Sequence, residues 1–144
     1  MATEKTARAT WEGSLAEGHG RFSLGSGAIT DQAVTWKDRA EEGDGTSPEE
    51  LIAGAHASCI LMALAGALAR ATTPPTKLES EARTTFEQVG DAFRITKIAL
   101  SIRGEVEGID AEAFQQAAQS AKENCPVSQA LKGNVEVTLD AALL

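Results

Sequence analysis

The chain has 144 residues, of which 42% are hydrophobic and 4% aromatic, and its formal net charge is −8. This length fits one compact domain with a thin core, so we expect a single domain over residues 1–144 that a partner subunit could complete. The acidic balance and the lack of a basic stretch exclude a nucleic-acid-binding surface and disfavour an anionic membrane surface.

Alternating residues and turn signals predict three strands in the N-terminal part of the chain. A Gly-Ser-Gly turn at 25–27 joins the second strand to the third. Trp11 and Trp36 are both assigned to sheet packing, and a polar, glycine-bearing loop follows at 41–45. The three strands are expected at 5–13, 18–24 and 28–36.

A long helix is predicted from about residue 48 to residue 71. Ser47 is a suitable N-cap, Pro48 fits the first helical position, and Glu50 completes a capping box. Residues 51–69 carry no charge over 19 positions, which is long enough to cross a membrane. Because this run is mostly Ala and Gly, without an aromatic belt or a basic flank, we expect a central helix surrounded by protein. The N-terminus lacks a secretory signal, so a cytoplasmic protein is expected.

The C-terminal half predicts a hairpin, two helices and a last strand. Gly90 and Asp91 form the hairpin turn, and Asp110 caps the first helix. The order is therefore three strands, a helix, two strands, two helices and a strand, which indicates an α+β fold with mostly antiparallel sheet. These elements are expected at 76–89, 92–104, 110–123, 125–133 and 134–142.

The two cysteines, Cys59 and Cys125, lie 66 positions apart and outside any CxxC or CxxH pattern. With two distant histidines they do not fit a four-ligand zinc site, and no metal or organic cofactor is expected. The ordinary role of Cys59, in the middle of an apolar helix, is that of a small core residue. A reactive Cys59 would have to be a thiolate, although burial raises its pKa and no helix N-terminus lies at this position.

A permanent cation near Cys59 is therefore the first requirement of a reactive thiol. Arg39, just before the acidic loop, can bind a carboxylate with its two-pronged guanidinium, and Lys37 and Arg21 are the other local candidates. Glu49 precedes Cys59 by ten positions, about 80° around the helix, and has no capping task. The alternative for each of the three cations is a solvated surface charge, and the alternative for Glu49 is a first-turn acid favoured by the helix dipole.

Cys125 stands in the N-cap position of the short helix, so its sulfur is expected to face the amides of that helix. This position suits a resolving cysteine, and the alternative is a lone buried thiol. His56 lies three residues before Cys59. It could act as a base for Cys59 in acyl-transfer or hydrolytic chemistry, but a core histidine with one satisfied nitrogen is the preferred interpretation.

Five motifs stand out along the chain: residues 11–13 (WEG), 45–52 (GTSPEELI), 55–59 (AHASC), 95–100 (ITKIAL) and 125–131 (CPVSQAL). Together they resemble the OsmC/Ohr family of osmotically inducible and organic hydroperoxide resistance proteins, over essentially the whole chain. Ser47 departs from the Asn that is common in this family, but both residues cap helices. The pattern is closer to the OsmC branch, in which the arginine before the acidic loop corresponds to Arg39 rather than Arg21.

The resemblance implies a thiol peroxidase that reduces organic hydroperoxides. It implies a sulfenic acid on Cys59, a Cys59–Cys125 disulfide, and assisting roles for Arg39 and Glu49. A small dithiol or a lipoyl-bearing protein would be the reductant. The family's fold implies an intertwined homodimer around the long central helix, with two active sites at the subunit interface. A Cys59–His56 acyl-transfer enzyme and a non-catalytic redox-sensing dimer remain the alternatives.

Overall fold

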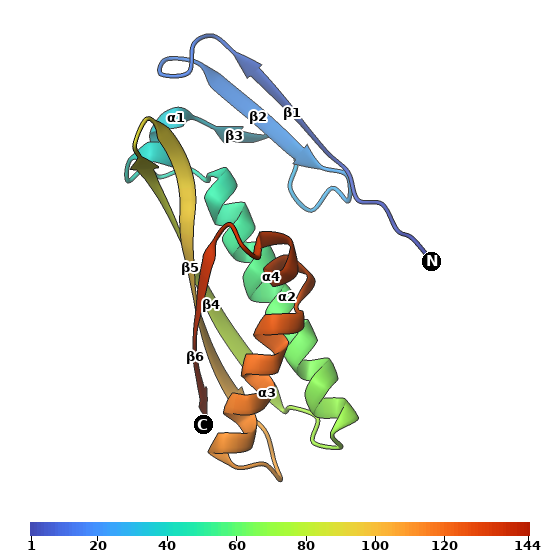
Figure 1. Ribbon diagram of the computed structural model, residues 1–144. Coiled ribbons are helices and arrows are strands. Elements are labelled where there is room, and N and C mark those ends of the chain that lie inside the picture. Colours follow the sequence, from blue (N-terminus) through green and yellow to red (C-terminus); the bar gives the residue numbers. More distant parts are fainter. The chain divides into compact units, whose positions relative to one another are not determined.

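The computed structural model describes residues 1–144, and the chain divides into two compact units, Met1–Glu50 and Leu51–Leu144. Figure 1 shows the elements of both. A single domain over residues 1–144 stays a prediction. The order of elements is as predicted from the sequence, with one additional short helix, α1, between the third strand and the long helix.

The first unit holds a three-stranded antiparallel sheet of β1 (Ala7–Glu12), β2 (His19–Leu24) and β3 (Gln32–Val34). It is followed by α1 (Trp36–Ala40). The strands occur in chain order, with β2 in the centre pairing with both neighbours. The loop after α1 returns to this sheet, since Thr46 forms an isolated parallel bridge with Val34.

The third strand is shorter than predicted, and the assignment of Trp36 to a strand was wrong. Thr35 is the N-cap of α1, and its side-chain oxygen accepts a hydrogen bond from the backbone N–H of Asp38 at 3.2 Å. Its hydroxyl also donates to the Asp38 carboxylate at 2.6 Å. The sequence Thr-Trp-Lys-Asp is therefore a helix-start signal, which overrides the β propensity of Val34, Thr35 and Trp36.

The second unit combines a three-stranded sheet with helices. β4 and β5 form a long antiparallel hairpin closed by Gly90 and Asp91, whereas β5 and β6 run parallel. The parallel pair arises because α3 and α4 supply the crossover that a parallel connection needs. The sheets are thus mostly antiparallel, as predicted. The elements are α2 (Pro48–Arg70, which begins in the first unit), β4 (Lys77–Val89), β5 (Ala92–Glu105), α3 (Ala111–Asn124), α4 (Pro126–Leu131) and β6 (Glu136–Leu143).

The core lies between α2, α3 and one face of this sheet (Figure 1). Alternate residues of β5 point into it, as the period of two in the sequence predicts, and residues four apart on α2 meet them. Cys125 is part of the same buried cluster. The fully or nearly fully buried apolar residues are Ile60, Leu64, Leu68, Ile98, Leu100, Ile102, Phe114, Ala118 and Ala121.

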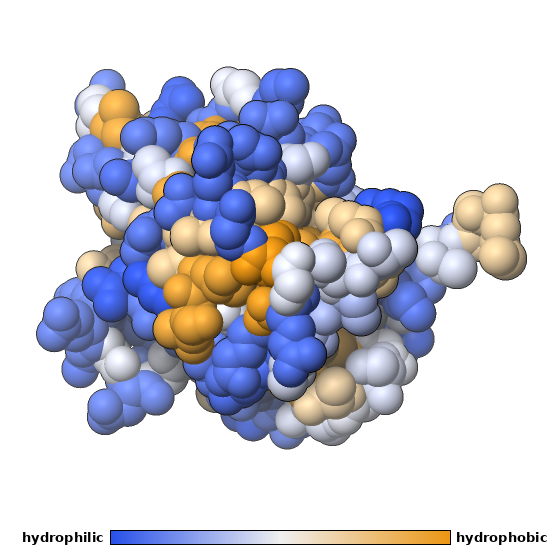
Figure 2. Space-filling model, turned by 90° about the horizontal axis from the view of Figure 1, so that it is seen from below, coloured by the Kyte–Doolittle hydropathy of each residue, from blue (hydrophilic) through white to orange (hydrophobic).

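One chain alone covers only part of α2. Within its most apolar 18-residue window, 22% is buried, and by length and composition alone the helix could cross a membrane, a property shared by core helices of soluble proteins. Gly54, Ala55 and Ser58 are exposed, and Met62 is 69% exposed. Seen in the space-filling view, the surface carries a hydrophobic patch bordered by hydrophilic side chains (Figure 2). Exposed apolar surface of this kind is typical of an interaction site.

Candidate functional site

The two cysteines lie side by side in the second unit. Cys59 is half-buried on α2, Cys125 is fully buried, and both are free thiols. The two thiols are close enough for Cys125 to raise the pKa of Cys59. Residues 66 positions apart in the sequence are therefore brought into contact by the packing of α2 against the α3–α4 corner.

Backbone hydrogen bonds fix Cys125 at that corner. Its N–H donates to the carbonyl of Ala121 at 2.8 Å, which ends α3, and its own carbonyl accepts from Gln129 N–H at 2.9 Å, which begins α4. Pro126 occupies the first position of α4, where a missing N–H costs no helical bond. The sequence predicts this N-cap position correctly.

Three neighbouring features set the protonation of Cys59. Burial raises the pKa of its thiol above the ordinary value of 9.0, and the Cys125 thiol raises it further. The backbone N–H of Val127 donates to the Cys59 sulfur and acts in the opposite direction, but the net shift is upward. At neutral pH, therefore, Cys59 is a protonated thiol unless a further positive charge approaches it.

The contact from Val127 corrects the sequence analysis in two respects. An N-terminal amide of α4 does reach Cys59, although Cys59 itself is in the middle of a helix. Conversely, Cys125 makes no side-chain capping hydrogen bond to α4. The Cys-Pro pair signals that a helix starts here, but only the tertiary contact shows which sulfur its amide meets.

A second group of candidate side chains lies in the first unit, where Arg39 of α1 binds Glu49 of the first turn of α2. Arg39 Nε donates to the two carboxylate oxygens at 3.0 and 3.2 Å, and Nη2 donates to Oε1 at 2.9 Å. Glu49 is 5% exposed, so its charge is shielded from water but fully paired. The guanidinium carbon lies 6.0 Å from the ring centroid of Trp36.

Hydrogen bonds order the loop between α1 and α2, which lies beside this pair in the sequence. The Asp38 carboxylate accepts the backbone N–H of Gly45 at 3.0 Å, and Ser47 Oγ accepts the N–H of Glu50 at 3.2 Å. The Glu50 carboxylate accepts from the Thr46 hydroxyl at 3.2 Å. Ser47 is thus the predicted cap, whereas the Glu50 side chain bonds to Thr46 instead of closing the capping box.

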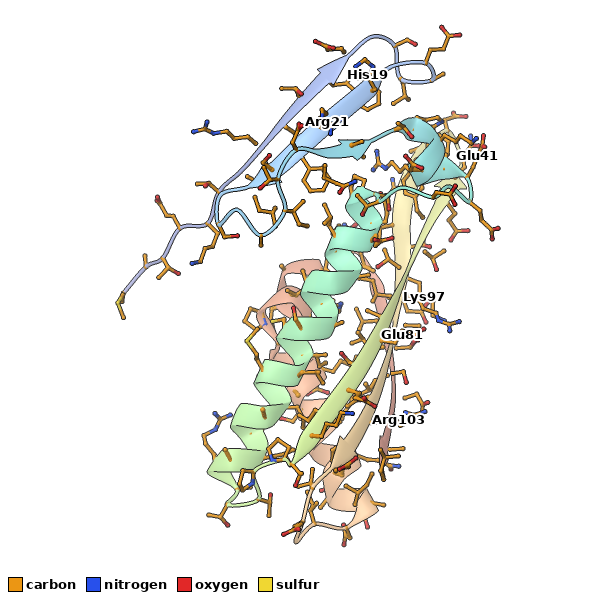
Figure 3. All side chains as sticks on the ribbon, turned by 180° about the vertical axis from the view of Figure 1, so that it is seen from behind. His19, Arg21, Glu41, Glu81, Lys97 and Arg103 are labelled. Atoms are coloured by element: carbon orange, nitrogen blue, oxygen red, sulfur yellow. The ribbon has the colours of Figure 1, made fainter.

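Arg21 has a different partner. It lies on β2 (Figure 3), and its Nε donates to Oδ1 of Asp31 at 2.6 Å. Both side chains are largely exposed, at 49% and 70%. A carboxylate partner with this exposure is typical of a surface ion pair. Of the two arginines considered from the sequence, Arg39 is the one that binds Glu49.

Next to Arg39 the first unit has an apolar pocket of about 330 Å³. Two indole rings and aliphatic side chains form most of its wall, and the guanidinium of Arg39 adds a charge. Sites for small organic ligands commonly combine apolar walls with one or two polar groups in this way. The lining residues are Trp11, Leu15, Val34, Thr35, Trp36, Arg39 and Pro48.

His56 is the core histidine expected from the sequence. Its side chain is fully buried, and Nε2 lies 2.7 Å from Oγ of Ser128, whereas Nδ1 has no hydrogen-bond partner. Burial lowers the pKa of the imidazole, which is therefore neutral at physiological pH. Its one hydrogen bond goes to Ser128 and not to Cys59. The structure contains no group of three His, Cys, Asp or Glu side chains arranged for a metal ion.

The chain is similar to OsmC and to organic hydroperoxide resistance proteins. The family model described as OsmC-like protein matches residues 41–140. Peroxiredoxin OsmC from Escherichia coli (strain K12) is 43% identical over 143 residues, which cover 99% of each chain. The organic hydroperoxide resistance protein from Xanthomonas axonopodis pv. citri (strain 306) is 32% identical over 101 residues, or 69% of each chain.

Solved structures show the same fold. The organic hydroperoxide resistance protein OhrB of Bacillus subtilis has a TM-score of 0.75 at 27% identity, covering 94% of this chain and 97% of its own. An organic hydroperoxide resistance protein from Elizabethkingia anophelis has a TM-score of 0.79 at 24% identity and full coverage of both chains. At the latter identity the likeness concerns the fold alone.

Proposed function

The chain belongs to the OsmC-like protein family, and from that premise we propose that it is a thiol-dependent peroxidase that reduces organic hydroperoxides to alcohols. The contact between the Cys59 and Cys125 thiols carries this proposal, because a peroxidase that recycles through a disulfide needs its two sulfurs adjacent. The names of the relatives, peroxiredoxin and organic hydroperoxide resistance protein, support the same reaction class.

The first half-reaction oxidises Cys59. Its thiolate attacks one oxygen of the O–O bond, that bond breaks, and the other oxygen leaves with a proton as the alcohol. Cys59 is left as a sulfenic acid, two electrons more oxidised. In the second half-reaction the Cys125 sulfur attacks the Cys59 sulfur, and water leaves as the disulfide forms. Cys59 is the partly accessible sulfur and Cys125 the fully buried one, which suits these two roles.

Regeneration of the thiols requires an external reductant. A small dithiol or a lipoyl-bearing protein can reduce the disulfide by exchange through a mixed disulfide. Such reductants are maintained in the cytoplasm, and we place the reaction there. No step requires a metal or an organic cofactor.

Arg39 and Glu49 supply the charge that the thiol pair lacks. A guanidinium next to Cys59 lowers the pKa that burial has raised, and it polarises the oxygen that leaves. The hydrogen bonds of Glu49 to Arg39 hold the guanidinium in one orientation, and its carboxylate can accept a hydrogen bond from the hydroperoxide.

The Arg39 guanidinium that acts on Cys59 belongs, on this proposal, to a second copy of the chain. Residues ten positions apart on an α-helix are separated by about 15 Å along its axis, so a guanidinium held at Glu49 is offset from Cys59 of the same helix. A two-fold homodimer that pairs the uncovered sides of two α2 helices would bring Glu49 of one copy toward Cys59 of the other. Each copy would then act as one OsmC-like domain, residues 1–144.

The pocket beside Arg39 supports an organic hydroperoxide as the substrate. Its walls of Trp11, Leu15 and Trp36 would bury an alkyl or aryl group, which hydrogen peroxide does not have. The acyl-transfer alternative loses its base, because His56 is bonded to Ser128 and has no bond to Cys59. A redox sensor would need the same thiols and differs only in lacking sustained turnover.

The test is consumption of cumene hydroperoxide with dithiothreitol as reductant, for the wild type and the Cys59→Ser and Cys125→Ser variants. We expect multiple turnovers by the wild type, none by Cys59→Ser, and a single oxidation event without a protein disulfide in Cys125→Ser. Unchanged consumption by Cys59→Ser would exclude the peroxidase. Disulfide formation in the wild type without sustained consumption would identify the sensor.

A further inference from the structure

We propose that His56 and Ser128 are positioning residues that hold α4 on α2, so that Cys125 stays within reach of Cys59 after Cys59 has been oxidised. The proposal deepens the peroxidase function and rests on it. It assigns a task to His56, a fully buried titratable side chain that the two half-reactions do not use.

Each of the two side chains lies three positions from one of the cysteines. His56 precedes Cys59 by three positions on α2, and Ser128 follows Cys125 by three positions at the start of α4. Positions three apart are neighbours on a helix surface. The His56–Ser128 hydrogen bond of 2.7 Å therefore runs beside the Cys59–Cys125 contact and joins the same two segments.

This hydrogen bond differs from its neighbours in being independent of sulfur. The two other polar contacts between the segments, from the Cys125 thiol and from Val127 N–H, both end on the Cys59 sulfur. Each changes when Cys59 becomes a sulfenic acid. The His56–Ser128 bond contains no sulfur atom, so oxidation of Cys59 changes neither its donor nor its acceptor.

The two bonded side chains are buried, so water does not compete for the hydrogen bond between them. His56 is fully buried, Ser128 is 8% exposed, and Nδ1 of His56 has no partner, so the imidazole has a single polar anchor. Losing that anchor would leave a buried ring without any hydrogen bond, which is unfavourable. The remaining contacts of α4 with the core, through Val127 and Leu131, are apolar and do not fix its register as a hydrogen bond does.

The position of Cys125 decides between two fates of the Cys59 sulfenic acid. Attack by the Cys125 sulfur gives the disulfide and water. Attack on a second hydroperoxide instead transfers another oxygen to Cys59, giving a sulfinic acid and a second alcohol, and this product is not recovered by thiols. The fraction of Cys59 that becomes sulfinic acid is therefore a measure of how well α4 is held.

The main test compares Ser128→Ala with the wild type under excess cumene hydroperoxide, with intact-protein mass spectrometry resolving disulfide from sulfinic acid. We expect disulfide formation to slow by about tenfold or more, as for a misplaced reacting group, while the first oxidation of Cys59 keeps its rate. Ser128→Thr keeps the hydroxyl, and the adjoining pocket of about 250 Å³ has room for its methyl group, so the disulfide should be restored.

Ser80→Ala is the matched control. Ser80 Oγ donates to the carbonyl of Ala57 at 2.8 Å, and so ties β4, rather than α4, to the same helix. The variant loses one half-buried hydroxyl that is hydrogen-bonded to α2 but should keep the wild-type division between disulfide and sulfinic acid. An equal shift in Ser80→Ala, or none in Ser128→Ala, would overturn the positioning role.

A redox titration in glutathione buffer separates this inference from the peroxidase proposal, because it needs no peroxide. The fixed position of Cys125 favours the disulfide, so Ser128→Ala should lower its equilibrium constant by about tenfold, a rise of about 30 mV in potential. That shift, without peroxide consumption by the wild type, would support the positioning role and refute the peroxidase. An unchanged potential would overturn the positioning role even in an active enzyme.

Discussion

The thiol region, Cys59 with Cys125, and the charged region, Arg39 with Glu49, contain complementary chemical groups. Cys59 and Cys125 have the nucleophile but no charge to ionise it, since burial raises the pKa of Cys59. Arg39 and Glu49 have a permanent charge in a fixed orientation but no nucleophile. A thiol peroxidase needs both, so the proposed reaction requires the two regions together.

The two regions also differ in what supports them. The cysteines sit against the main core, between two helices and the second sheet. The charged pair depends on a five-residue helix and an exposed loop, pinned by Asp38 and Ser47. Substitutions in the charged region should therefore change reactivity strongly while leaving the main core intact.

Removal of the guanidinium should have the largest effect. We expect Arg39→Ala to slow the oxidation of Cys59 by cumene hydroperoxide by about a hundred- to a thousandfold, because the charge that stabilises the thiolate and the leaving oxygen is gone. The pH at which Cys59 reacts should also rise. Stopped-flow oxidation rates measured across a pH series test both. Arg39→Lys should restore little, because an ammonium cannot make the two-pronged contact.

Neutralising the carboxylate should have a smaller effect. Glu49→Gln leaves the guanidinium in place but weakens its orientation, and we expect a loss of about tenfold in the same rate. Glu42→Gln, in the exposed loop, makes the same change in net charge and serves as the control. Equal rates for both variants would mean that Glu49 contributes only to net charge.

The buried histidine gives a prediction about acid stability. The pKa of His56 is lowered in the folded chain, so the unfolded chain binds the proton more readily below its ordinary pKa of 6.5. The free energy of unfolding should be insensitive to this group above that pH and fall below it, by at most about 1.4 kcal/mol per pH unit. Urea unfolding of wild type and His56→Gln at several pH values measures this, and the variant should lose that part of the pH dependence.

The smallest effect is expected at Arg21. Its ion pair with Asp31 is largely exposed, so Arg21→Ala should change the free energy of unfolding by less than about 1 kcal/mol and leave peroxide reduction intact. The stopped-flow oxidation assay proposed for Arg39→Ala also tests Arg21→Ala. A loss of activity comparable to that of Arg39→Ala would transfer the catalytic charge to Arg21.

Local signals made much of the fold predictable. The N-cap at Ser47 and the turn at Gly90 and Asp91 are encoded in a few adjacent residues, and the long helix and the hairpin fall where those residues place them. The helix at Trp36 was missed because its cap, Thr35, also has a high β propensity. In that case a single capping side chain outweighed the pattern of the strand.

The candidate site was harder to predict from the sequence, because it depends on contacts between distant segments. The rarity of cysteine singles out Cys59 and Cys125, but their contact follows from the packing of α2 against the α3–α4 corner. Neither the amide of Val127 nor the bond between His56 and Ser128 has a local signature that names its partner. Only the arrangement of the helices reveals them.

The most direct measurement of whether the two regions form one site is peroxide consumption by mixed dimers. Cys59→Ser and Arg39→Ala should each be inactive or nearly so alone. Unfolded together and refolded, half of the dimers would be mixed, and each mixed dimer would hold one intact site, so about a quarter of the wild-type activity should return. Activity no higher than that of the separate variants would contradict the claim that one chain supplies the charge for the thiols of the other.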